Sequence, residues 1–218
     1  MYGHLHVEKF SGLTRSDGEV SSFGVLKPFG ELPKRDVRRL SALERGVVAC
    51  LMGLNESVEN GLGNTPIVLA SRYGAMTNTL ELLKLINQSE TLSPTGFSLS
   101  VHNAAVGVGS QLTANRGGHT AIAAGERTLA EGLTESYARL KDGAGSIVLM
   151  MSDCHLQNEY AEFGDTTRDV QFALLLKLPD ANTKLDAAGF QTVDDGMSGV
   201  FACLDAVSKD IRGLRWKI

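Results

Sequence analysis

The sequence is poor in cysteine, lacks long apolar runs and carries little excess charge of either sign. Its three cysteines, Cys50, Cys154 and Cys203, are odd in number and widely spaced, which favours neither a disulfide framework nor a zinc site. No apolar run approaches the ~20 residues that a membrane span requires. The formal net charge of −4 gives no reason to expect nucleic acid or an anionic membrane as partner. We therefore expect a cytoplasmic protein with no membrane span, no metal and no cofactor.

The composition is that of an ordinary globular protein. Hydrophobic residues make up 43% of the 218 positions, enough for a sizeable core in one α/β domain or a closely joined pair. No composition shift marks a linker, so we expect a single domain over residues 1–218. Apolar runs alternate with amphipathic segments, which predicts a layered α/β fold. We expect strands at 5–10, 66–71, 120–124, 146–151 and 169–178, helices at 33–52, 75–86, 98–112, 128–140 and 199–211, and loops at 11–33 and 55–65.

The most informative segment is a run of small residues that ends in a turn. Residues 121–124 (AIAA) lead to Gly125 and Glu126, and a helix is expected directly afterwards. A turn residue at a helix N-terminus lies near free N–H groups and the positive end of the helix dipole. Enzymes place nucleophiles at such turns. Glu126 is therefore either a favourable first-turn residue or a replacement for a nucleophile, and the pattern alone leaves both interpretations open.

Two separated segments carry a resemblance to a known family. Residues 97–104 (FSLSVHNA) and 120–126 (TAIAAGE) resemble the N-terminal half of β-ketoacyl synthases. The sequence is most similar to the short chain-length-factor type of aryl polyene and related type II polyketide or fatty acid systems. The resemblance extends over 38–153 and more weakly to 178. It implies a thiolase-like, layered α/β/α fold that comprises mainly the N-terminal half of a condensing enzyme.

The resemblance also implies a catalytically silent subunit. In active synthases the turn holds a nucleophilic cysteine; here that position falls on Glu126, with Gly125 as the next possibility, and neither can form a thioester. The C-terminal half that supplies the other catalytic residues of active synthases is largely absent. The expected partner is a catalytic ketosynthase in a heterodimer, which receives its substrates on acyl carrier protein.

The same resemblance assigns an interface strand and tunnel positions. The interface strand comprises Thr120, Ala121, Ile122, Ala123 and Ala124. The alternative is that this strand is central in its own sheet. Acyl-tunnel gating residues map to Tyr73, Met76 and Leu80, whose i, i+3, i+7 spacing puts them on one helical face. The alternative is an ordinary core stripe.

Other functions remain open or are disfavoured by the sequence. A stand-alone acyl-processing enzyme could use Glu126 as general acid or base if that carboxyl is buried. A plain assembly protein would have no tunnel at all. Gly107 and Gly109 make too short a glycine pattern to bind a dinucleotide. The adjacent side chains at 153–155 rarely converge on one metal ion, and we interpret His102 as a hydrogen-bonded core group rather than part of a hydrolase site.

Overall fold

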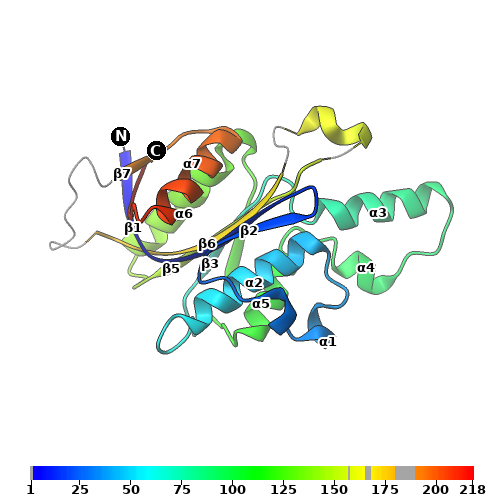
Figure 1. Ribbon diagram of the computed structural model, residues 1–218, viewed down its shortest axis with the longest axis horizontal. Coiled ribbons are helices and arrows are strands. Elements are labelled where there is room, and N and C mark those ends of the chain that lie inside the picture. Colours follow the sequence, from blue (N-terminus) through cyan, green and yellow to red (C-terminus); the bar gives the residue numbers. More distant parts are fainter. Residues whose placement is uncertain (1, 157, 165–167, 180–189) are drawn as a thin grey trace.

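The computed structural model describes residues 2–156, 158–164, 168–179 and 190–218. Within those residues, eight strands form one mixed sheet (Figure 1). Its strand order is β4-β3-β5-β6-β1-β8-β7, and β2 pairs separately with β1. The strands are β1 (Tyr2–Ser16), β2 (Glu19–Gly24), β3 (Ile67–Ala70), β4 (His119–Ile122), β5 (Ile147–Asp153), β6 (Asp169–Lys177), β7 (Phe190–Val193) and β8 (Gly213–Lys217).

Helices cover both faces of the sheet, which confirms the predicted α/β/α layering. In Figure 1, α6 and α7 lie on one side, and α2 and α5 lie on the other. The α-helices are α1 (Lys34–Val37), α2 (Ala42–Glu56), α3 (Met76–Asn87), α4 (Pro94–Ser98), α5 (Ala104–Leu112), α6 (Thr128–Lys141) and α7 (Gly196–Ser208). Short 3-10 helices are η1 (Phe29–Glu31), η2 (Gly125–Arg127) and η3 (Asn158–Phe163).

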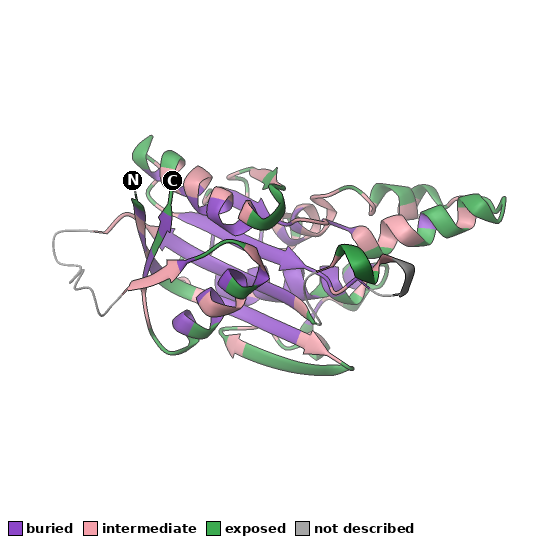
Figure 2. Cartoon of the chain, turned by 90° about the horizontal axis from the view of Figure 1, so that it is seen from above, coloured by how far each residue is buried: buried purple, intermediate pink, exposed green. Residues whose placement is uncertain are grey.

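The central strands explain why continuous apolar runs predicted buried strands. Along β3, Val68 and Ala70 pack into the core beneath α6 and α7, whereas Ile67 and Leu69 pack into the core beneath α2 and α5. Successive side chains of a strand point to opposite faces, so a strand covered on both sides needs apolar residues throughout. Every residue of β5 is likewise buried, as Figure 2 shows for the middle of the sheet.

Two helix predictions, 33–52 and 98–112, are wrong at their N-terminal ends, and the helix predicted at 199–211 lies three residues earlier, as α7. The predicted helix 33–52 is split, because Ser41 starts α2 with a capping box: the Glu44 N–H donates to the Ser41 hydroxyl at 3.2 Å and the Ser41 N–H donates to the Glu44 carboxylate at 2.7 Å. The predicted helix 98–112 begins only at Ala104, after a separate short α4 capped by Ser93. The helices predicted at 75–86 and 128–140 are confirmed as α3 and α6.

The predicted loop at 11–33 is also wrong in its first half. There β1 continues to Ser16 and turns into β2 as an antiparallel hairpin. Asp17 and Gly18 form the turn with positive φ angles of 49° and 83°. Asp-Gly between strands is a strong signal for this two-residue turn, because both positions need left-handed backbone. Strands β7 and β8 were not predicted either.

Close backbone packing against α2 generates a stability prediction. The Lys27 N–H donates to the Ala49 carbonyl at 3.2 Å, and a Cβ on Gly53 would overlap the carbonyl oxygen of Val25. We expect Gly53→Ala to lower the free energy of unfolding by about 1–3 kcal/mol, as overpacking does. Gly107→Ala in α5 is the matched control: nothing lies within 4 Å of a Cβ there, so this variant should be ~0.5–1 kcal/mol more stable. Equal urea midpoints for the two variants would contradict the packing argument.

Candidate functional site

Strand β4 lies at one end of the strand order and pairs in parallel with β3. The alternative that this strand is central in its own sheet is therefore wrong for the single chain. The strand itself ends at Ile122, so the predicted range of 120–124 is too long by two residues at its C-terminal end. Ala123 and Ala124 follow it as exposed residues in the connection to η2.

The outer edge of β4 presents backbone groups that β3 does not use. Gly118 O accepts from Ile67 N–H at 3.0 Å, and Ile122 O accepts from Ser71 N–H at 3.0 Å. Because backbone groups alternate in direction along a strand, those of His119 and Ala121 face away from β3. The strand HTAI carries no Lys, Pro or bulge of the kind that usually protects an exposed edge.

Glu126 lies at the predicted corner between a strand and a helix. It is the middle residue of η2, which follows β4 and leads directly into α6. Gly125 has a φ of +59°, a left-handed conformation that glycine adopts without strain. The Thr128 hydroxyl donates to Gly125 O at 2.7 Å and accepts from Ala124 N–H at 3.0 Å. These bonds fix the turn, and the Glu126 side chain is exposed in the single chain.

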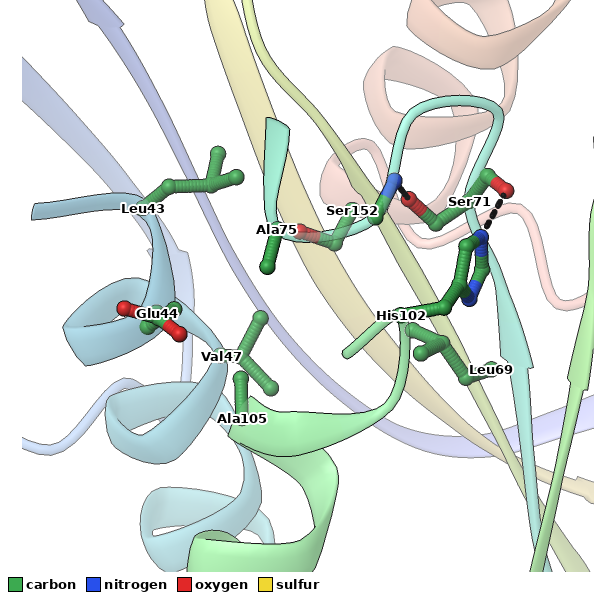
Figure 3. A pocket seen from close by; sticks show the side chains of 10 residues that line it. Leu43, Glu44, Val47, Leu69, Ser71, Ala75, His102, Ala105 and Ser152 are labelled. Carbon is green, nitrogen blue, oxygen red and sulfur yellow. Dashed lines mark hydrogen bonds between the residues drawn. The ribbon is translucent and has the colours of Figure 1, made fainter. Parts of the chain in front are cut away.

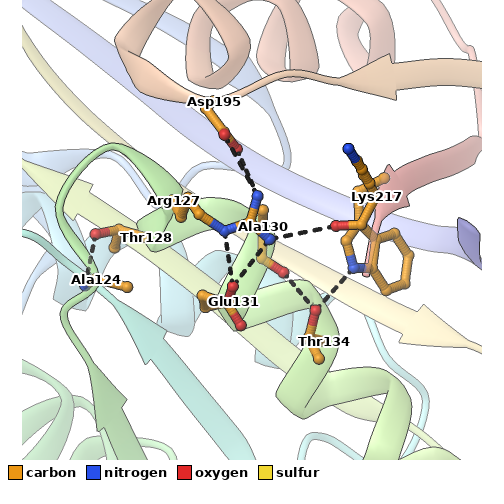
Figure 4. Close-up of polar contacts among 9 residues, drawn as sticks. Ala124, Arg127, Thr128, Ala130, Glu131, Thr134, Asp195 and Lys217 are labelled. Carbon is orange, nitrogen blue, oxygen red and sulfur yellow. Dashed lines mark hydrogen bonds and ion pairs between the residues drawn. The ribbon is translucent and has the colours of Figure 1, made fainter. Parts of the chain in front are cut away.

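Arg127, next to Glu126, ties the corner to the C-terminal part of the fold (Figure 4). Its guanidinium donates to Glu131 at 2.9 Å, to both carboxylate oxygens of Asp195 at 3.3 Å, and to the carbonyl of Lys217 at 3.3 Å. Asp195 immediately precedes α7, and Lys217 ends β8. The bond to Glu131 and the charge of Asp195 raise the pKa of Arg127. One side chain thus joins η2, α6, α7 and β8.

A cleft lies between four segments of the chain. They are the first residues of α2, helix α3, the residues just after β5, and η3. Its volume is about 310 Å³. Apolar side chains and a charged or polar rim line it together: Ser41, Ala42, Leu43, Met76, Thr77, Leu80, Glu81, Lys84, Cys154, His155, Leu156, Tyr160 and Asp169. Apolar walls with a few polar groups are typical of small-molecule sites. Of the three residues predicted for a tunnel, Met76 and Leu80 therefore lie together on its wall.

Tyr73 is placed differently from the other two predicted tunnel residues. It lies in the bend before α3, so the single helical face predicted for all three residues is wrong. Tyr73 packs, like Met76, against the buried cluster of Leu43, Cys154 and Leu156, whose members line the cleft. The Tyr73 hydroxyl donates to the carbonyl of Phe163 at 2.7 Å. Tyr73 thus contacts residues of the cleft wall without lining the cleft itself.

The bend before α3 is held by Asp153, one of the adjacent residues at 153–155 that the sequence disfavours as metal ligands. One carboxylate oxygen, Oδ1, accepts from Arg72 N–H at 2.8 Å, from Tyr73 N–H at 3.2 Å and from the Ser71 hydroxyl at 3.3 Å. Asp153 is 1% exposed. Burial raises the pKa of its carboxyl to about 6, although the three hydrogen bonds and the charge of Arg72 act in the opposite direction.

His102 bonds to Ser71, the first residue of this bend, and Figure 3 shows the two side by side. Its Nε2 lies 2.9 Å from the carbonyl oxygen of Ser71, whose hydroxyl also accepts from Gly74 N–H at 2.8 Å. The interpretation of His102 as a hydrogen-bonded core group fits these contacts. The cavity around these residues has a volume of about 10 Å³, which is too small for an acyl chain. The cleft beside Met76, with its volume of about 310 Å³, is the candidate ligand site.

The three cysteines lie in apolar surroundings away from the corner in sequence. Burial raises the pKa of the Cys50, Cys154 and Cys203 thiols to about 12 each. Because the thiolate is the nucleophilic form of cysteine, these groups are weak nucleophiles near neutral pH. Among the described residues, no group of three or more His, Cys, Asp or Glu side chains is placed to hold a metal ion. Over the same residues, no helix combines the length and apolar character that a membrane crossing requires.

A parallel β3–β4 pair, a sharp corner into α6 and helices on both faces agree with the thiolase-like α/β/α fold that the resemblance implies. A family model described as β-ketoacyl synthase, N-terminal domain, matches residues 22–200. Because that match spans most of the sequence, the chain belongs to the β-ketoacyl synthase N-terminal domain family. The match confirms the resemblance carried by 97–104 and 120–126 and extends beyond the range predicted for it.

Solved structures support the same fold. A chain in the complex of the ketosynthase ApeO with its chain length factor ApeC, from Xenorhabdus doucetiae, is similar with a TM-score of 0.71 and 21% identity. The alignment covers 82% of this chain and 81% of that one. A β-ketoacyl synthase from Burkholderia phymatum is similar with a TM-score of 0.56 and 8% identity, over 81% of this chain and 59% of that one. A search of curated proteins found no match.

The buried carboxyl of Asp153 generates a pH prediction. Its pKa is about 6 in the folded chain against an ordinary 3.8, so the folded state binds this proton more tightly than the unfolded state. The associated stability is fully present below about pH 4 and is lost as the pH rises through 6. Asp153→Asn keeps an Oδ1 acceptor and removes the charge. Relative to this variant, the wild type should lose up to about 3 kcal/mol of unfolding free energy between pH 4 and 7.

Urea unfolding at several pH values checks this prediction. Asp169→Asn is the control, because it removes a carboxylate that is 22% exposed and paired with Arg15 at 3.5 Å instead of one enclosed in the fold. The stability difference between wild type and Asp153→Asn could instead stay constant from pH 4 to 7. That result would show that the buried carboxyl does not change protonation in this window.

Proposed function

We propose that the chain is a non-catalytic, chain-length-factor-like subunit that pairs with a catalytic ketosynthase in polyene, polyketide or fatty acid biosynthesis. The observation that carries the proposal is the corner after β4. By the family resemblance this corner is where the nucleophilic cysteine belongs, and here it holds Glu126. A carboxylate there cannot form the thioester on which the condensation reaction depends.

The state of the thiols supports catalytic silence. Cys50 and Cys203 are fully buried, and Cys154 is 5% exposed. All three thiols hold their protons near neutral pH because burial raises their pKa. The enzyme alternative requires a buried carboxyl at 126, whereas this side chain is exposed in the single chain. The proposal therefore assigns the decarboxylative condensation of malonyl units to the partner, which receives them on acyl carrier protein.

The free edge of β4 supports the proposed pairing. In the proposal, Thr120, Ala121 and Ile122 form the interface strand, and Ala123 and Ala124 continue the contact beyond it. Backbone groups of His119 and Ala121 face outwards and are available to bond to a strand of the partner. Small side chains allow the two backbones to approach without steric conflict. Such pairing satisfies the hydrogen bonds of an edge that lacks the usual protection.

The cleft beside α3 supports a role in setting acyl chain length. Met76 and Leu80 line it, and Tyr73 packs against the same buried residues. Side chains in a packed wall yield little, so their bulk sets how much of an acyl chain fits. The proposal further includes a single domain over 1–218 and a cytoplasmic location, where acyl carrier protein substrates would be met.

The proposed pairing predicts co-purification with the matching ketosynthase. Co-expression should give a stable heterodimer, which size-exclusion chromatography and light scattering measure. Ala121→Pro removes an outward-facing N–H while leaving the β3 ladder intact, so it should weaken the heterodimer at least about tenfold. Ala121→Ser keeps the N–H and is the matched control. A monodisperse monomer that persists beside the ketosynthase would refute the pairing.

The proposed cleft predicts a change in product length. In the heterodimer, Met76→Trp should shorten the product by about one two-carbon unit, because the larger ring fills part of the cleft. Met76→Leu conserves volume and should leave the length unchanged. Mass spectrometry of the released products measures both. An unchanged length with Met76→Trp would favour an assembly protein without a tunnel.

Glu126→Gln in the same heterodimer assay separates the proposal from the enzyme alternative. The amide keeps the size of the side chain and removes its acid–base function. A silent subunit predicts nearly unchanged yield and length, whereas a general acid or base at 126 predicts that turnover collapses.

A further inference from the structure

A groove lies at the opposite end of the sheet from the cleft beside Met76. Its volume is about 510 Å³, within the range of ~300–1,000 Å³ that is typical of small-molecule sites. Thr65 and Ser146 line it and precede β3 and β5 in the sequence, so the groove lies at the amino ends of these parallel strands. In Figure 1 the segment that follows α2, which forms one wall of the groove, lies on the opposite side of the molecule from α3. We call this site the Lys9 groove.

An irregularity in β1 turns Lys9 towards the groove. The pairing of β1 with β6 shifts between Val7 and Lys9, so Glu8 is an extra residue in β1. Val7 packs beneath α6 and α7 and Leu13 packs beneath α2 and α5, although residues an even number of positions apart share one face of a regular strand. Lys9 pairs with Leu175, which packs beneath α2 and α5. Directly opposite residues point to the same face, so the extra residue places Lys9 on the side of α2.

The rim of the Lys9 groove carries two charges that have no partner. Lys177 Nζ donates to the Glu8 carboxylate at 2.9 Å, so these two charges neutralise each other. Lys9 and Glu59 are exposed, and neither has a hydrogen-bond or ion-pair partner among the residues that the structure describes. Lys9 belongs to β1 and Glu59 to the segment after α2, so they line different walls. The groove therefore offers one free cation and one free anion on separate walls.

The floor of the Lys9 groove is aliphatic. Leu62 and Leu175 are 1% and 4% exposed, and Val58 packs against the same core. The wall after α2 is held by its own hydrogen bonds: the Leu62 N–H donates to Asn55 Oδ1 at 2.8 Å, and the Gly61 N–H donates to the Val58 carbonyl at 2.9 Å. A wall that is already ordered loses little conformational entropy when a ligand binds.

The two free charges determine which class of ligand fits. A small anion would be repelled by Glu59, and a small cation would be repelled by Lys9. A molecule that carries one charge of each sign finds a partner on each wall and leaves its apolar part for the floor. Among the described residues that line the groove, none is aromatic, so the floor suits an aliphatic body.

We propose that the Lys9 groove binds a small zwitterion with an aliphatic body, the class that leucine represents. Lys9 contacts its carboxylate, Glu59 contacts its ammonium group, and Leu62 and Leu175 contact its side chain. This site goes beyond the proposed function, because it lies away from the corner, the β4 edge and the cleft beside Met76. Such a ligand binds the folded chain only, so it should also raise the melting temperature.

Isothermal titration calorimetry of the full chain with L-leucine tests the proposal, and a single saturable site is expected. Isocaproate lacks the ammonium group and isoamylamine lacks the carboxylate, so each should bind about fivefold more weakly than leucine. Glycine keeps both charges but lacks the aliphatic body, and it should bind at least about tenfold more weakly. The absence of saturable leucine binding, or equal affinity for leucine and glycine, would overturn the proposal.

Two variants that remove one charge each assign the two walls. Lys9→Gln should weaken the binding of leucine and isocaproate about fivefold and leave that of isoamylamine unchanged. Glu59→Gln should weaken the binding of leucine and isoamylamine about fivefold, without weakening that of isocaproate. Lys34→Gln and Glu90→Gln are matched controls, because these exposed charges lie outside the groove. Both controls should bind all ligands as the wild type does.

The pattern of losses separates the proposal from its alternatives. If neither Lys9→Gln nor Glu59→Gln weakens the binding of leucine, leucine binds elsewhere and the proposal is overturned. If isocaproate binds as tightly as leucine and only Lys9→Gln weakens both, the occupant is an apolar anion and the zwitterion is wrong. Because these titrations involve no ketosynthase, their outcome does not depend on the pairing proposed at β4.

Discussion

The buried carboxylate of Asp153 joins the end of β5 to the bend that leads into α3, and the candidate site is built on these two segments. It ends β5 and accepts three hydrogen bonds from residues 71–73, directly after β3. Because β3 and β5 are parallel neighbours, this contact joins their carboxyl ends. The bend that it fixes leads into α3, and Arg72 in that bend reaches the carbonyl of Gly125 at the corner. The cleft, helix α3 and the corner are thus all connected to the Asp153 carboxylate.

The three hydrogen bonds also explain why a carboxylate occupies this position, although burial disfavours its charged form. The raised pKa shows that desolvation outweighs the bonds to the carboxylate. An apolar residue in its place would leave the N–H groups of Arg72 and Tyr73 without an acceptor, and unpaired buried donors cost about as much as the bonds they lose. The carboxylate is therefore better understood as a means of fixing one bend than as a source of stability.

The sequence predicted the strands that are covered on both faces and the turn whose signal is local in the sequence. Continuous apolar runs at 66–71 and 146–151 mark buried strands because no polar residue fits either face, and the corner at 125–126 follows from small residues leading into a helix. The β1–β2 hairpin was missed although Asp17-Gly18 signals it, because the surrounding Gly and Ser residues were interpreted as loop. Strands β7 and β8 are short; β8 pairs with β1, which is distant in the sequence, and β7 pairs with β8.

The candidate site was predicted only in part, for a similar reason. Glu126 could be placed because its position depends on neighbours in sequence. The cleft could not, because it joins Leu43, Met76 and Leu156 from three elements far apart along the chain. Tyr73 was assigned to the tunnel by the resemblance and to one helical face by its spacing from Met76 and Leu80, yet α3 begins only at Met76. A buried Asp at the end of an apolar strand was the available signal, since ligands commonly bind at the carboxyl ends of such strands.

The exposed edge of β4 has a thermodynamic consequence for the proposed heterodimer. It exposes to water the outward-facing backbone groups of His119 and Ala121, which a partner strand would cover. Partner binding removes them from water in the folded state only, so it shifts the folding equilibrium towards the folded chain by mass action. Glu126 stands at the corner after β4, where its carboxylate remains solvated in the single chain. Covering it would carry a desolvation cost, so the proposed interface must either leave a path to water at 126 or supply a hydrogen-bond donor there.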